Sequence, residues 1–105
     1  MTYGDRESIV HLLGDLAKSN EEDMSRLVKL FSDGDFSAIA DLTHRIKGGA
    51  RIIKAQGLIQ CCEQVQQDCS DRNPAKLTQS VDELHQAMEA LARMMATYIG
   101  EVAEE

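Results

Sequence analysis

One histidine with a lysine and two glycines close behind it carries the clearest chemical signal in this sequence. His44 lies three residues before Lys47 and four before Gly48, in the stretch DLTHRIKGGARIIKAQG at residues 41–57. Residues three and four apart are neighbours on a helix surface, so both border the imidazole if this stretch is helical. Glycine in a helix interior costs about 1 kcal/mol relative to alanine, so Gly48 and Gly49 need a physical reason.

The chemistry that suits this group is phosphoryl transfer. Histidine has a reference pKa of about 6.5, so neutral imidazole with a free nitrogen lone pair is available near neutral pH. Transfer to that nitrogen requires an in-line approach and neutralisation of the charge on the phosphoryl oxygens. We expect His44 to be the nucleophile and Lys47 to supply the positive charge. Gly48, without a side chain, would leave room for a large partner surface.

The charge of the chain is acidic overall and basic around the histidine. The net charge of −7 argues against nucleic acid or anionic lipid as the main partner. Four of the eleven lysines and arginines nevertheless lie within residues 45–54, and this segment holds no acidic residue. These four are Arg45, Lys47, Arg51 and Lys54. A basic patch on an acidic body suits a small anion or the acidic pocket of a partner, although an ordinary solvated face would have the same composition.

Hydrophobic periodicity predicts an all-α chain that forms one domain over residues 1–105. We expect four helices, at about residues 6–32, 36–55, 58–70 and 74–102, with any irregularity of the first one near Gly14 or Ser19-Asn20. Short connections make successive helices antiparallel neighbours in an up-down-up-down four-helix bundle. The last helix has the most regular pattern, because its apolar residues alternate at three and four from Leu77 to Val102.

Helix-end signals divide the segments. Gly34 is expected to end the first helix and Asp35 to cap the second. Asn73 followed by Pro74 marks the start of the fourth. Gly57 is expected to separate the second helix from the third.

The second helix has two distinct faces. At 100° per residue, an apolar side gathers residues that include Ile39, Leu42, Ile46, Gly49, Ala50 and Ile53. His44, Lys47, Gly48 and Arg51 fall on the opposite, wetter side. We therefore expect His44 and Gly48 to be exposed, whereas Gly49 would let another helix approach closely.

The sequence does not support several classes of function. No apolar stretch approaches the roughly 20 residues of a membrane span, and no signal-peptide core follows Met1. Cys61, Cys62 and Cys69 fit neither a disulfide framework nor a zinc-binding spacing, so we expect reduced thiols on a helix in the cytosol. A glycine-rich phosphate loop is missing, so ATP-dependent kinase activity is not expected in this segment.

The run His44-Arg-Ile-Lys47-Gly48-Gly49-Ala50, followed by Ile53 and Leu58, resembles the signature of the histidine-containing phosphotransfer (HPt) domain. The upstream FSDGDFSAIADLTHRIKG is also similar to that family's entry into its active helix, and the likeness covers essentially the whole chain. In detail the chain is most similar to the C-terminal HPt domains of hybrid sensor histidine kinases of the BvgS/EvgS type. The resemblance implies a cytoplasmic four-helix bundle. The sequence leaves the oligomeric state open, and a monomer is the default expectation for the isolated domain.

The resemblance also implies roles for particular residues. His44 would accept a phosphoryl group from an aspartate of a receiver domain and pass it to the aspartate of a response regulator. Lys47 would stabilise that group, and Gly48 would give the receiver access. Arg45, Arg51 and Lys54 would form the docking surface for the receiver. The receiver would hold the Mg²⁺, so this chain is expected to bind no cofactor.

Two positions depart from the family pattern. Lys54 stands where many members carry glycine, and Ile52 stands where many carry a polar amide. Either change could alter which receiver is preferred.

Two other classes of function remain open. Asp41 and His44, like Asp82 and His85, have the carboxylate-x-x-histidine spacing used by metal-binding bundles, although such ligands must point inward. A scaffolding bundle that dimerises through its fourth helix is the other alternative. His11 has no expected role.

Overall fold

The computed structural model describes residues 2–104 of the chain, and the side chains of residues 7–101. It contains four helices: α1 (Thr2–Asp33), α2 (Phe36–Ile52), α3 (Gln56–Asp71) and α4 (Pro74–Glu104). Within the described part of the chain there is no β-strand. The predicted all-α four-helix bundle is confirmed, and α1 runs without interruption through both Gly14 and Ser19-Asn20.

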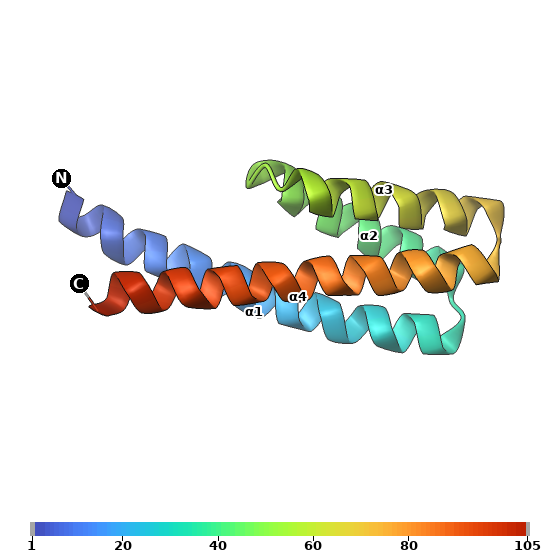
Figure 1. Cartoon of the computed structure of the whole chain (residues 1–105), viewed down its shortest axis with the longest axis horizontal. Coiled ribbons are helices and arrows are strands. Elements are labelled where there is room, and N and C mark those ends of the chain that lie inside the picture. Colours follow the sequence, from blue (N-terminus) through green and yellow to red (C-terminus); the bar gives the residue numbers. More distant parts are fainter. Residues whose placement is uncertain (1, 105) are drawn as a thin grey trace.

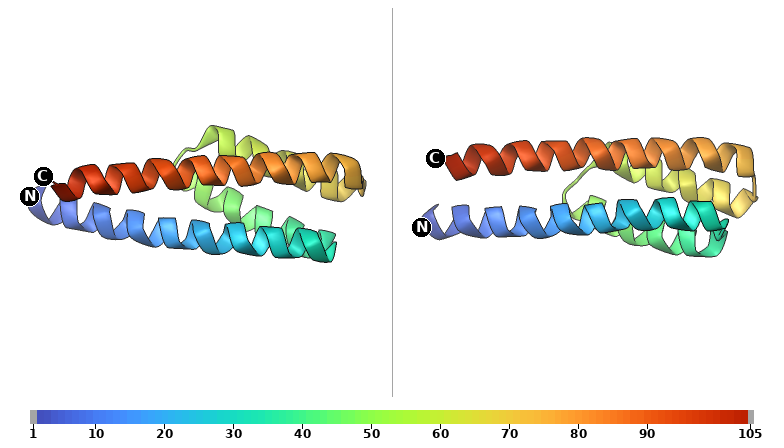
Figure 2. Two further views of the ribbon diagram at one scale, coloured as in Figure 1. Left: turned by 60° about the horizontal axis from the view of Figure 1, so that its bottom comes forward. Right: turned by 90° about the horizontal axis from the view of Figure 1, so that it is seen from below.

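The four helices are antiparallel, and they differ in length (Figure 1). Helices α1 and α4 have 32 and 31 residues, whereas α2 and α3 have 17 and 16. The two long helices therefore continue beyond the α2–α3 turn as a pair, with both chain ends at the same end of the molecule (Figure 2). Along this two-helix extension, large apolar side chains such as Leu12, Met94 and Tyr98 are exposed, because no other helix covers them.

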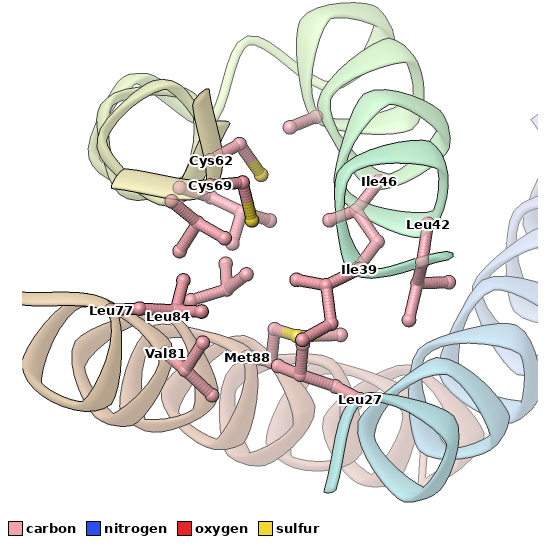
Figure 3. Packing of buried hydrophobic residues seen from close by; sticks show 13 residues of the cluster. Leu27, Ile39, Leu42, Ile46, Cys62, Cys69, Leu77, Val81, Leu84 and Met88 are labelled. Carbon is pink, nitrogen blue, oxygen red and sulfur yellow. The ribbon is translucent and has the colours of Figure 1, made fainter. Parts of the chain in front are cut away.

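The core lies where all four helices run together (Figure 3). Leu27 of α1 is fully buried there, and Ile39, Leu42 and Ile46 of α2 point toward the other helices. Helix α4 contributes the apolar alternation predicted for it. The buried members of that series are Leu77, Val81, Leu84, Met88 and Met95. Of the remaining positions, Leu91 is half-buried, Tyr98 is exposed, and the side chain of Val102 lies outside the described ones.

Two of the three turns follow the predicted end signals. Gly34 has a φ of +69°, and the Asp35 carboxylate accepts a hydrogen bond of 3.1 Å from the backbone N–H of Ala38. At the start of α4, the Asn73 side chain accepts a hydrogen bond of 3.2 Å from the backbone N–H of Lys76. These contacts satisfy N–H groups that have no partner inside their helix.

The α2–α3 turn differs from the prediction. Helix α2 ends at Ile52 rather than Ala55, and Gly57 is the second residue of α3 rather than the break between helices. Lys54 makes the turn, with a φ of +58°. The cost of glycine applies to helix interiors, and Gly57 lies at the very start of α3. Ile53, expected on the apolar stripe, lies at the end of α2 and is exposed.

Replacement of Lys54 by glycine is expected to stabilise the bundle. A left-handed conformation strains residues that carry a Cβ, and glycine avoids that strain. Glycine also loses more backbone entropy on folding than lysine does, and this loss offsets part of the gain. We expect a net increase of about 0.5 kcal/mol in the free energy of unfolding. Urea denaturation measures this change. Lys29→Gly, on the exposed surface of α1, removes the same charge and should instead destabilise by about 1 kcal/mol; equal effects of both variants would contradict the strain.

The three cysteines are free thiols in or beside the core. Cys62 and Cys69 are buried and Cys61 is partly exposed. Burial raises the pKa of all three thiols, and it raises that of Cys62 to about 12. A raised pKa leaves less thiolate, the reactive form, at any pH below it. The cysteines therefore contribute apolar packing to the bundle.

Thiol labelling checks this placement. At pH 8, an alkylating reagent is expected to modify Cys61 first, whereas Cys62 and Cys69 should react only when the bundle opens. Mass spectrometry of digested samples, taken with and without urea, measures each rate. Equal rates for all three thiols in the native protein would contradict the burial of Cys62.

Candidate functional site

The candidate site is built on the solvent-facing side of α2. Ile46 and Thr43 are buried, and the Thr43 hydroxyl donates a hydrogen bond of 2.6 Å to the Ile39 carbonyl. With these neighbours turned inward, His44 is exposed, as predicted. A reacting group can therefore reach the imidazole from solvent.

Gly48 leaves open space one turn beyond His44. It is exposed, and a Cβ placed on it would meet no atom within 4 Å outside its own stretch of helix. Four residues advance a helix by one turn and about 40°, so this bare patch of backbone borders the imidazole. The predicted accessibility of this face is confirmed.

Lys47 lies against α3. Its side chain is only 14% exposed, and its Nζ atom is 4.0 Å from Oε2 of Glu63. The sequence analysis did not identify Glu63, because the contact joins two helices and depends on how they are packed. The antiparallel pairing of α2 with α3 is the signal that could have suggested it.

Arg45 bridges α2 and α1. Its Nη2 donates a hydrogen bond to Oδ1 of Asp23, whose side chain is 10% exposed. The side chain of Arg45 remains 57% exposed, so part of the guanidinium faces solvent. Asp23 was also missed, although it follows Asn20 by three residues and precedes Leu27 by four, the spacing of a buried helix stripe.

The remaining basic residues lie toward the α2–α3 turn. Arg51, two turns beyond His44, and Lys54 are both exposed. Between them, Ile52 is 82% exposed. The basic patch therefore extends from His44 to the turn and includes an apolar side chain at that end.

Gly49 was predicted to let another helix approach closely, and the structure contradicts this prediction. It is exposed, and a Cβ at this position would meet no atom within 4 Å, so no helix packs closely on it. Gly49 instead lines a hollow shared with Asp23 and Arg45. The prediction was wrong because angular position on α2 does not show how closely α1 approaches.

The other histidines lie apart from this face. His85 Nδ1 is 3.1 Å from Oε1 of Glu89 on the same helix, and His11 is exposed on α1. Among the described side chains, those of residues 7–101, no group of three or more histidine, cysteine or acidic residues is arranged to hold a metal ion. The same part of the chain has no helix with the length and apolar character of a membrane span.

Fold and site together define a class of protein. The family model of the Hpt domain matches residues 11–94, which include all of α2 and α3 and the face that carries His44. The chain belongs to this family. It is a histidine phosphotransfer module of a phosphorelay, and its partners are of the receiver-domain type.

The curated relatives that match this chain include two virulence sensor proteins. The chain is 36% identical over 59 residues to the virulence sensor protein BvgS of Bordetella bronchiseptica and 34% identical over 59 residues to BvgS of Bordetella pertussis. Each match covers 56% of this chain and 5% of the relative. The chain thus corresponds to a small part of these proteins. No solved structure matches it significantly.

Proposed function

We propose that His44 is the residue that carries the phosphoryl group. The observation that supports this most directly is an exposed imidazole beside the open space at Gly48. In the transfer, the lone pair of Nε2 attacks phosphorus in line with the bond to the receiver aspartate. The N–P bond forms as the P–O bond breaks, the electron pair of that bond leaves with the carboxylate, and Nδ1 keeps its proton. Onward transfer reverses these steps with a second aspartate.

The cations around His44 would serve this transfer in different ways. Lys47 would neutralise charge on the phosphoryl oxygens, since such stabilisation is the main contribution a protein makes to this chemistry. Arg51, Lys54 and the exposed part of Arg45 would dock the acidic pocket of the receiver. That pocket would hold the Mg²⁺, and this chain would act as a monomer without a cofactor of its own.

The similarity to BvgS supports a place for this module in a hybrid sensor histidine kinase. The donor would then be the receiver domain of the same kinase, and the acceptor would be the receiver domain of a response regulator. The module would work in the cytoplasm, and ATP would be consumed elsewhere in the parent chain.

Transfer from a phosphorylated receiver tests the proposal. The protein is incubated with a radiolabelled phospho-receiver and Mg²⁺, in the absence of ATP, and the acid and alkali stability of the transferred label is measured. Acid-labile, alkali-stable label on this chain is the expected result, because a phosphohistidine behaves in this way. ATP alone should give no label. Label that survives acid would contradict phosphorylation on histidine.

A further inference from the structure

We propose that Glu63 is a counter-ion that restrains Lys47 while His44 is unmodified, and that the arriving phosphoryl group must displace it. The proposal rests on the proposed role of His44 and assigns a function to a residue outside the sequence motif. Glu63 would be a positioning residue, because it acts through Lys47.

The contact between the two side chains is the first observation. Lys47 comes from α2 and Glu63 from α3, and 4.0 Å separates Nζ from Oε2. Lys47 is mostly covered, at 14% exposed, whereas Glu63 is 54% exposed. The ammonium is thus held against α3, while the carboxylate can turn into water when it is released.

Cys62 supports the same placement. After burial and Cys61, the charges of Lys47 and Glu63 are the next influences on the pKa of its thiol: Lys47 lowers it and Glu63 raises it. Both charges therefore lie near one buried sulfur at the α2–α3 contact. Because burial keeps this thiol protonated, it does not compete as an anion for Lys47.

The consequence concerns how strongly His44 holds a phosphoryl group. The ion pair is long, at 4.0 Å between Nζ and Oε2, and its carboxylate is 54% exposed to water, so it is weak. A phosphoryl group with two negative charges can therefore take the ammonium from Glu63. The carboxylate nevertheless competes with the phosphoryl group for the ammonium of Lys47. Glu63 thereby lowers the share of phosphoryl group that rests on His44, which favours onward transfer.

Glu63→Gln tests this effect. With wild-type protein, a phospho-receiver and Mg²⁺ at equilibrium, the label is divided between His44 and the receiver aspartate, and the ratio is measured after electrophoresis. We expect Glu63→Gln to raise the ratio on His44 by roughly two- to fivefold, as expected for loss of a weak ion pair. Glu83→Gln on α4, whose carboxylate acts on Cys61 instead, removes the same charge and should leave the ratio unchanged.

A Lys47→Gln background shows whether Glu63 acts through Lys47. There, Glu63→Gln is expected to have no further effect on the ratio. The excess over Glu83→Gln should also shrink as salt is raised, because ions screen exposed charges. An unchanged or lower ratio in Glu63→Gln, or the same rise without Lys47, would overturn the counter-ion role. Absence of acid-labile label on the wild-type protein would instead reject the proposed function.

Discussion

His44→Gln abolishes phosphoryl acceptance from a phospho-receiver: this is the largest effect we expect from any single substitution. Glutamine has similar reach and polarity, but its amide nitrogen has no lone pair free for attack on phosphorus. We expect transfer to fall at least 100-fold, to the background of the assay. Because His44 is exposed and makes no packing contact that the core needs, the free energy of unfolding should change by less than about 0.5 kcal/mol.

His11→Gln is the matched control for this loss. His11 is also exposed on a helix, so the same substitution there tests whether removal of any surface histidine matters. We expect normal labelling in His11→Gln and two-state urea unfolding in both variants. Acid-labile label on His44→Gln, or its loss in His11→Gln, would show that the phosphorylated residue has been misassigned.

The sequence predicted the features of the fold that depend on local periodicity. The three-four alternation of α4 placed Leu77, Leu84 and Met88 in the core, where they are buried. Caps at Asp35 and Asn73 were predictable because their contacts span only three residues. The α2–α3 turn was misplaced because glycine was taken as the sign of a break, whereas Lys54 adopts the left-handed conformation.

The residues of the site also differ in whether local periodicity could predict them. His44 and Gly48 were predictable because they share one face of one helix, and their exposure follows from the stripe opposite. Glu63 and Asp23 were not, because each contact joins two helices whose relative rotation and spacing are set by the whole core. The prediction of close helix packing at Gly49 was wrong for the same reason. Periodicity indicates which face is buried but not how closely a neighbouring helix approaches.

These cross-helix contacts change how the basic patch is understood. The sequence analysis grouped Arg45 with Arg51 and Lys54 as one docking surface, but Arg45 is bound to Asp23, and Lys47 lies beside Glu63. Arg51 and Lys54 are exposed near the α2–α3 turn, together with Ile52. We therefore expect receiver docking to depend more on the turn end of α2 than on Arg45.

Gly48→Gln separates access to His44 from helix stability. A Cβ at Gly48 would meet no atom within 4 Å outside its own stretch of helix, and glutamine favours helix over glycine by roughly 0.5 kcal/mol or more. The variant should therefore be at least as stable as the wild type. Its side chain would nevertheless stand where the receiver must approach. Phosphoryl transfer needs reacting atoms about 3–3.5 Å apart, and a misplacement of about 1 Å can lower a rate roughly 100-fold.

We therefore expect Gly48→Gln to slow transfer from a phospho-receiver by between about 10- and 100-fold while raising the urea midpoint. Gly49→Gln is the matched control, since Gly49 is the next residue of α2, is also exposed, and would likewise accept a Cβ with no atom within 4 Å. It lies about 140° around the helix from His44, compared with about 40° for Gly48, and faces the hollow beside Asp23. Both variants should gain stability, and only Gly48→Gln should lose transfer. Equal transfer rates in the two variants would show that the bare backbone at Gly48 does not provide the receiver's access to His44.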